Sequence, residues 1–209
     1  NNKKYSWIVQ NDLMKSDLSN KFKISKEKIR ISPIFENLKN SNSNKLDSFI
    51  YPTTISKHKN NIRLLKAFVL SAEQLPHLSF NLKITINKTT ETERVMINAP
   101  KNLTIDFLGS LTRDDVIAEI SKSKFLIFPS LSESFGLPLI EGCQLGCYVI
   151  CSDLPYVHQI IRPTLTFDPY SVHSISKMIN QSLQDKNRIF TEMKIESATQ
   201  LILNELTHV

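Results

Sequence analysis

The segment formed by residues 125–153, FLIFPSLSESFGLPLIEGCQLGCYVICSD, constrains the fold more than any other part of the chain. It opens with the apolar run FLIF, which is hydrophobic on both faces and ends at a proline, and so predicts a buried parallel strand. A polar loop follows, and residues 137–145 predict a helix, with Pro138 in the first turn, where a missing N–H is tolerated. Gly146 is a typical helix stop. The apolar run at residues 148–151 predicts a second strand, so the segment forms one βαβ unit.

Two glutamates flank the start of this predicted helix, with the spacing Glu-x7-Glu. Glu133 lies in the loop before the helix, and Glu141 lies inside it. Between them, the N–H groups of Phe135, Gly136 and Leu137 lie at a helix N-terminus, where the helix dipole favours a phosphate. Carboxylates accept hydrogen bonds from sugar hydroxyls. The pattern therefore indicates a site for a pyrophosphate flanked by two sugars, which is a nucleotide-sugar.

The sequence ESFGLPLIE, preceded by FPS and followed by a strand of the pattern G-x-Y-V-I-x-S-D, resembles the donor-binding signature of the retaining glycosyltransferases of family four, or group 1. The resemblance implies that this chain is the C-terminal domain of a GT-B enzyme, the domain that binds the sugar donor. It also implies that Glu133 approaches the hydroxyls of the transferred sugar, that Glu141 holds the ribose, and that the amides of residues 135–137 contact the donor. In the alternative interpretation, both glutamates are solvated charges beside an ordinary βα turn.

A second part of the expected donor site precedes a helix predicted at residues 60–74. Lys59 lies just before the N-terminus of that helix, where an ammonium group complements a phosphate. The resembled family usually has a Lys followed by Gly or Asn at this position, and Lys59-Asn60 matches. The family often also has an Arg a few residues upstream, but residues 53–56 are Thr-Thr-Ile-Ser. Lys57 is the substitute that the chain offers.

A third part of the expected site lies between a strand predicted at residues 103–108 and a helix predicted at residues 112–121. In the resembled family, a strand, a glycine, a loop and a helix lie beside the nucleobase. The resemblance therefore places Ser110 and Leu111 near the base, where the contacts are mostly to the backbone.

The alternation of strands and helices from residue 49 onward predicts an α/β fold, a Rossmann-like doubly wound parallel sheet of about six strands. The sequence lacks both the Gly-x-Gly-x-x-Gly pattern and the Gly-Lys-Ser/Thr phosphate loop, which argues against a dinucleotide-dependent oxidoreductase and a P-loop NTPase. Residues 87–93 predict a polar loop, and residues 189–206 predict a last helix. Residues 37–47 are polar and predict a loop or a disordered link.

The resemblance also implies a division of the chain. Residues 1–47 are expected to be the remnant of an N-terminal domain with its linker, residues 48–187 the donor-binding domain, and residues 188–209 a C-terminal helix. The sequence does not begin with Met, and the chain is expected to be a fragment. Val9-Gln10 with Met14, followed by residues 29–33, resembles the family's passage from the N-terminal into the C-terminal domain, which implies a start near the end of a missing N-terminal domain.

Charge and cysteine content limit the partners and the compartment. The net charge of +6 suits an anionic donor, and the sequence carries no recognised nucleic-acid-binding motif. No apolar run reaches the roughly 18 residues needed to span a membrane. The three cysteines, Cys143, Cys147 and Cys151, suit neither a disulfide framework nor a zinc site and predict small buried hydrophobic residues in a reducing compartment. A cytoplasmic location follows, with peripheral contact to the inner face of the membrane left open.

The first hypothesis for function is the donor-binding domain of a retaining glycosyltransferase of polysaccharide biosynthesis. The full enzyme would transfer a hexose-type sugar from a UDP- or GDP-sugar to a glycan or lipid-linked acceptor, which the missing N-terminal domain would bind. In this hypothesis Lys59 stabilises charge on the leaving diphosphate and Glu133 orients the transferred sugar. No metal and no cofactor besides the donor is expected, and this chain alone should bind donor with little or no turnover.

The second hypothesis is a non-catalytic domain that binds a nucleotide-sugar or serves as a partner subunit, and the absence of Arg from residues 53–56 motivates it. An epimerase or a phosphorylase of the same architecture is a third interpretation. A phosphorylase needs a lysine that carries pyridoxal phosphate, and nothing in the sequence marks one.

Overall fold

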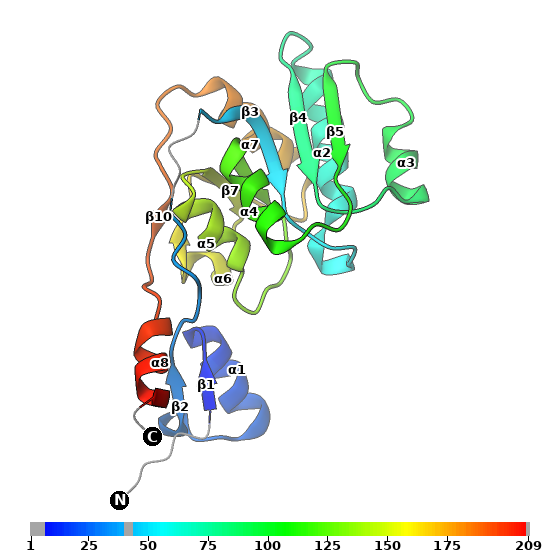
Figure 1. The fold of residues 1–209 in the computed structure, drawn as a ribbon. Coiled ribbons are helices and arrows are strands. Elements are labelled where there is room, and N and C mark those ends of the chain that lie inside the picture. The colour runs from blue at the N-terminus through cyan, green and yellow to red at the C-terminus, as the bar shows by residue number, and fades with distance from the viewer. Residues whose placement is uncertain (1–6, 40–43, 208–209) are drawn as a thin grey trace, which may run out of the picture.

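The centre of the structure is a parallel sheet with the strand order β5-β4-β3-β6-β7-β9 (Figure 1). The six strands are β3 (Leu46–Tyr51), β4 (Phe80–Ile84), β5 (Leu103–Phe107), β6 (Ser123–Phe128), β7 (Tyr148–Ser152) and β9 (Leu165–Phe167). This computed structural model describes residues 7–39 and 44–207, so part of the loop predicted at residues 37–47 lies outside the described residues. The parallel α/β sheet confirms the predicted fold class.

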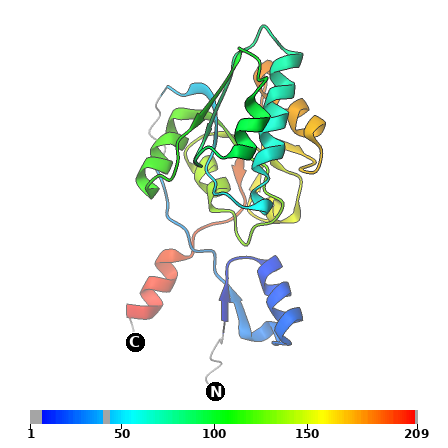
Figure 2. The same cartoon turned by 90° about the vertical axis from the view of Figure 1, so that its right-hand side faces the viewer.

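Helices cover both faces of the sheet (Figures 1 and 2). Helices α2 (Asn61–Gln74) and α7 (Val172–Gln184) pack together on one face, and α3 (Thr90–Met96) lies beside α2. Helices α4 (Arg113–Lys122) and α5 (Leu137–Gln144) lie on the other face. From β3 the chain adds β4 and β5 on one side and then returns to add β6 on the other. The reversal between β3 and β6 is the point where open α/β sheets bind ligands.

Aromatic side chains fill the core at this reversal. Phe49 of β3 and Phe125 of β6 are partners across the two strands, and their rings stack with centroids 4.8 Å apart. Phe68 of α2 meets Phe49 edge-on at 5.2 Å. All three side chains are fully buried, as expected of a parallel sheet with helices on both faces.

Helix α5 lies very close to β6. Gly142 faces Leu126, and a Cβ at Gly142 would lie 2.8 Å from Leu126 Cδ1. The helix ends one residue earlier than predicted, and Gly146 follows with φ +73°, which confirms it as the helix stop. The close packing fixes where the N-terminus of α5 lies relative to the end of β6.

A second, smaller βαβ unit precedes the sheet. Strands β1 (Trp7–Val9) and β2 (Ile29–Ile31) pair in parallel around α1 (Asp12–Phe22) and the short 3-10 helix η1 (Lys26–Lys28). Helix α8 (Thr199–Thr207) lies beside β2, where Arg30 Nη1 contacts Glu205 Oε2 at 2.7 Å (Figure 1). The two ends of the described chain therefore lie in the same part of the molecule.

Three predictions of secondary structure were wrong. Leu46 and Asp47, expected in a loop, begin β3. Residues 90–93, expected in a loop, begin α3, because Thr89 and Thr92 form a reciprocal capping box. The helix predicted at residues 189–206 starts only at Thr199. The preceding segment is extended: β10 (Glu192–Met193) pairs with β8 (Ile161–Arg162), and Thr191 Oγ1 accepts a hydrogen bond from Val149 N at 2.9 Å. Tertiary contacts override the helical pattern there.

The cysteines behave as the sequence predicts for buried apolar residues. Cys147 and Cys151 are buried, Cys143 is half-buried, and all three are free thiols. Burial raises the pKa of Cys143 and of Cys147 to about 11. The nucleophilic thiolate is therefore scarce at neutral pH. In the described part of the chain, no helix is long and apolar enough to cross a membrane.

Gly142→Ala should destabilise the fold by about 1–3 kcal/mol, because the new methyl group overlaps the buried side chain of Leu126. The gain in helix propensity, about 1 kcal/mol, offsets only part of this cost. Urea unfolding of the variant measures the change. Leu126→Ala makes room, so the double variant should lose less stability than the sum of the single variants. Strict additivity would show that the two side chains do not meet.

Candidate functional site

Two loops meet at the reversal between β3 and β6 and are held together by hydrogen bonds. One contains the 3-10 helix η2 (Lys57–Lys59), and the other joins β6 to α5 at residues 129–136. His58 O accepts hydrogen bonds from Leu131 N at 2.7 Å and from Ser130 Oγ at 3.2 Å. Tyr51 OH donates to Lys59 O at 2.7 Å. These bonds fix the backbone on both sides of the predicted donor site.

The β6–α5 loop is also anchored from two other directions. Ser130 O accepts hydrogen bonds from Ser152 Oγ and from Tyr156 OH, each at 2.8 Å. From the smaller βαβ unit, Asn11 Nδ2 donates to Ser134 O at 3.0 Å. Burial is the main cause that raises the pKa of both Tyr51 and Tyr156, so both phenols stay protonated as donors. A loop held at this many points presents Glu133 in one position.

Asn60 explains why the chain has Lys-Asn at the start of α2. Its φ is +60°, in the left-handed region that Gly and Asn tolerate best. Its side-chain Nδ2 donates to Pro129 O at 3.1 Å and to Pro169 O at 2.8 Å. Asn60 therefore turns the chain into α2 and ties this turn to the loops after β6 and β9.

Lys59 and Glu133 form an ion pair across the two loops. Lys59 Nζ lies 2.6 Å from Glu133 Oε1, and both side chains are largely buried. Lys59 Nζ also lies 5.8 Å from the centre of the Phe128 ring. The structure thus brings the two residues predicted as catalytic into direct contact, and the ammonium group is neutralised by the carboxylate.

The N-terminus of α5 is built from the three predicted amide donors. Gly136 is the N-cap with φ +80°, so no side chain caps the helix. Phe135 is buried and packs against Phe35 with ring centroids 6.3 Å apart, while Leu137 is exposed. The N–H groups of Gly136 and Leu137 precede the first hydrogen bond of the helix, whereas Pro138 has no N–H and Leu139 N donates to Gly136 O at 2.9 Å. An anion could therefore accept hydrogen bonds here without displacing a side chain.

Glu141 is held by a residue that the sequence analysis did not single out. Its side chain is 6% exposed, and its Oε1 lies 2.7 Å from Arg113 Nη1. Arg113 Nη2 also lies 3.5 Å from Glu36 Oε2 at the surface. The hydrogen bond to Glu141 is the main cause that raises the pKa of Arg113. The residue predicted to bind ribose is therefore a buried, paired carboxylate.

Leu111 lies in the loop between β5 and α4, two residues before Arg113, and its side chain is half-buried. The Arg113–Glu141 contact consequently brings the end of this loop to α5. A sequence signal for Arg113 existed but was missed. An Arg in the first turn of a helix opposes the helix dipole, which favours acidic residues such as Asp114 and Asp115 there.

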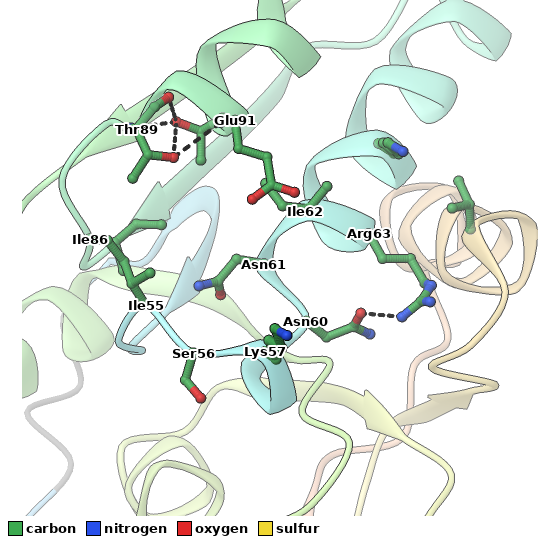
Figure 3. A pocket seen from close by; sticks show the side chains of 13 residues that line it. Ile55, Ser56, Lys57, Asn60, Asn61, Ile62, Arg63, Ile86, Thr89 and Glu91 are labelled. Atoms are coloured by element: carbon green, nitrogen blue, oxygen red, sulfur yellow. Dashed lines mark hydrogen bonds between the residues drawn. The ribbon is translucent and has the colours of Figure 1, made fainter.

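A cavity of about 570 Å³ opens beside η2 (Figure 3). Lys57, Arg63 and Glu91 are among the described residues that line it, whereas Lys59, Glu133 and Glu141 are not. Lys57 and Lys59, two residues apart, therefore have different surroundings: Lys57 lines the cavity, and Lys59 pairs with Glu133.

Comparison with known proteins gives a family match. A family model described as "Glycosyl transferases group 1" matches residues 34–200. The "Serotype-specific mannosyltransferase WbdA" of Escherichia coli is 34% identical over 95 residues, which are 45% of this chain and 12% of that protein. The "O-antigen chain mannosyltransferase B" of Escherichia coli is 34% identical over 82 residues, which are 39% of this chain and 22% of that protein. The matched stretch is thus a small part of either relative.

Solved structures share the fold at low sequence identity. The pneumococcal O-GlcNAc transferase GtfA, in complex with UDP and GlcNAc, superposes with a TM-score of 0.65 at 22% identity, over 87% of this chain and 39% of that chain. TarM of S. aureus, in complex with Fondaparinux, alpha-GlcNAc-glycerol and UDP, gives a TM-score of 0.69 at 14% identity, over 85% of this chain and 36% of that chain.

Asn60→Ala should destabilise the fold more than Asn60→Gly. Both variants lose the hydrogen bonds to Pro129 O and Pro169 O, for about 1–3 kcal/mol. Ala adds about 1–2 kcal/mol of backbone strain at a positive φ, which Gly avoids. Chemical unfolding of the pair separates the two causes. Equal stability of the two variants would mean that the left-handed turn is not required.

Proposed function

Since the chain belongs to the family Glycosyl transferases group 1, we propose that it is the part of a glycosyltransferase that binds the nucleotide-sugar donor. The observation that carries the proposal is the Lys59–Glu133 pair beside the uncapped N-terminus of α5. A cation and free N–H groups suit a diphosphate, and a carboxylate next to them suits sugar hydroxyls. We propose UDP or GDP as the nucleotide, which Glu141 would hold through the ribose and Leu111 near the base.

In the proposed reaction, the bond between the anomeric carbon and the diphosphate oxygen breaks, the oxygen of an acceptor hydroxyl bonds to the same face of that carbon, and the proton of the hydroxyl passes to the leaving diphosphate. Negative charge grows on the leaving diphosphate as its bond breaks. Lys59 and the amides of residues 135–137 would stabilise this charge. Glu133 would orient the transferred sugar through its hydroxyls. The acceptor, a glycan or a lipid-linked sugar, would bind to the part of the enzyme that faces this edge of the sheet.

Because Lys59 and Glu133 are already paired with each other, donor binding would replace this ion pair with contacts from the donor to both residues. Glu133 neutralises Lys59 at 2.6 Å, so a diphosphate must attract the ammonium group away from the carboxylate. The released carboxylate is then free to accept hydrogen bonds from the sugar. Phosphate and sugar binding would support each other by this exchange, whereas a nucleotide without sugar would leave the carboxylate unpaired beside the phosphates.

The transferred sugar is proposed to be a hexose. Relatives of this chain are named mannosyltransferases, including "O-antigen chain mannosyltransferase RfbU" of Salmonella typhimurium, which is 28% identical over 86 residues. Mannose is therefore the first sugar to test, and assembly of a surface polysaccharide is the proposed pathway. Among the described residues, no group of His, Cys, Asp and Glu is placed to hold a metal ion, and we propose catalysis without one.

A non-catalytic domain that binds a nucleotide-sugar is the second candidate. Residues 53–56, Thr-Thr-Ile-Ser, provide no Arg for the phosphates, and Lys57 lines the separate cavity. The full-length protein distinguishes the two candidates. Transfer or hydrolysis of the donor in the presence of EDTA supports the metal-independent enzyme, whereas binding without turnover supports the sensor or partner domain.

A thermal-shift panel with UDP, GDP, ADP and their sugars tests donor binding to this chain. A ligand at about 100 times its Kd should stabilise the fold by about 2.7 kcal/mol and raise Tm by about 5–10 °C. We expect a shift with UDP or GDP that is lost in Glu141→Ala. The control Glu119→Ala removes a partly buried carboxylate of α4 that pairs with Lys83 and Lys122, and it should retain the shift. The absence of a shift with every nucleotide would contradict the proposal.

Glu133→Gln should strengthen the binding of the nucleoside diphosphate and weaken that of the nucleotide-sugar. Removing the charge frees Lys59 for the phosphates, and we expect a several-fold lower Kd for the diphosphate, which corresponds to about 1 kcal/mol. Titration calorimetry with both ligands measures the two effects. Weaker binding of both ligands would show instead that the carboxylate serves only to hold Lys59 in place.

A further inference from the structure

Arg113 connects three parts of the molecule that are distant in the sequence. It begins α4 and lies two residues after Leu111. Its Nη1 contacts Glu141 of α5 at 2.7 Å, and its Nη2 lies 3.5 Å from Glu36, in the segment that leads from β2 to β3. The side chain of Arg113 is half exposed, whereas that of Glu141 is almost fully buried. The guanidinium therefore lies between the buried carboxylate of Glu141 and the surface.

The position of Arg113 is unfavourable for α4 itself but favourable for Glu141 of α5. A cation in the first turn of a helix is disfavoured by the helix dipole. A buried carboxylate without a partner is far more costly. Among the described residues, Arg113 is the side chain that donates a hydrogen bond to Glu141. The position of Arg113 is thus explained by the needs of Glu141 and not by those of α4.

The geometry leaves Glu141 able to bind a ligand. Arg113 engages Oε1, and Oε2 retains its acceptor capacity. A carboxylate fixed in one rotamer suits two adjacent hydroxyl groups, because both donors then meet acceptors at known positions. We propose that Arg113 is a positioning residue that keeps the carboxylate of Glu141 oriented for the ribose diol, and so makes the site selective for ribonucleotides. This inference rests on the proposed function.

The pairing with Glu36 contributes little to this role. Glu36 is 63% exposed and lies 3.5 Å from Nη2, and exposed pairs of this kind are weak. Glu36→Gln consequently removes a charge from the same guanidinium and leaves the contact with Glu141 intact. It is the matched control for changes at Arg113.

The test compares a ribonucleotide with its 2′,3′-dideoxy analogue. Kd is measured by calorimetry on this chain for UDP, GDP and their dideoxy forms, with the wild type, Arg113→Gln, Arg113→Lys, Glu141→Gln and Glu36→Gln. Arg113→Gln should weaken binding of the preferred ribonucleotide about 10-fold or more, the effect expected for a hydrogen bond to a charged group. Binding of the dideoxy analogue should change less than about 2-fold. Arg113→Lys should recover part of the loss, since it restores the charge without the forked geometry.

A double variant tests whether Arg113 acts through Glu141. In the Glu141→Gln background, Arg113→Gln should cost little more, because it acts through a carboxylate that is already gone. Glu36→Gln should bind like the wild type. Melting temperatures of the unliganded variants show whether each one folds, and Arg113→Lys serves as the test variant if Arg113→Gln does not.

Three outcomes would overturn the inference. Equal weakening of the ribonucleotide and the dideoxy analogue would assign Arg113 to the phosphates, the base or the fold. Unchanged ribonucleotide binding in Arg113→Gln would remove its role altogether. If the wild type binds no nucleotide, the proposed function fails with it. The first two outcomes leave nucleotide binding intact, so failure of the inference and failure of the proposed function are distinguishable.

Discussion

The hydrogen bonds between η2 and the β6–α5 loop determine the geometry of the whole candidate site. The order in which strands are added reverses between β3 and β6, so the two loops that follow these strands are far apart in sequence but meet in space. The loops are joined by hydrogen bonds at His58 O and Asn60 Nδ2. These bonds hold Lys59 Nζ within 2.6 Å of Glu133 Oε1. Neither charged residue could be placed by its own element alone. The positions of the polar groups in the site are therefore set by the contacts between the two loops.

Much of this architecture is determined by short-range patterns that a sequence reveals. The apolar runs of β3 and β6, Pro138 at the start of α5 and Gly146 at its end follow from local chemistry, and each was predicted. The residues of the candidate site were found by type and by resemblance to a family, because phosphate and sugar hydroxyls restrict the side chains that suit them. Their roles in binding remain predictions.

What the sequence did not show depends on contacts between distant segments. The partnership of Arg113 with Glu141 could not be inferred, because it requires knowing that α4 and α5 share one face of the sheet. The extended course of residues 189–198 was missed for the same reason: the pairing of β10 with β8 and the bond from Val149 N to Thr191 outweigh a helical pattern. The capping box of α3 was missed because Thr92 occupies a position where Glu or Gln is the usual signal.

The strand order also sets a sequence of events during folding. β3 can pair with β4 as soon as α2 has formed, but its other edge must wait until the chain has been made as far as β6. Until then an apolar strand edge, with Phe49 beside it, stays open to other chains. Pairing β3 with β6 is slow, because it closes a long stretch of chain and chain entropy is lost before any contact forms. The junction that would bind the donor thus forms only after β6 has been made, and until then its open strand edge exposes a newly made chain to misassembly.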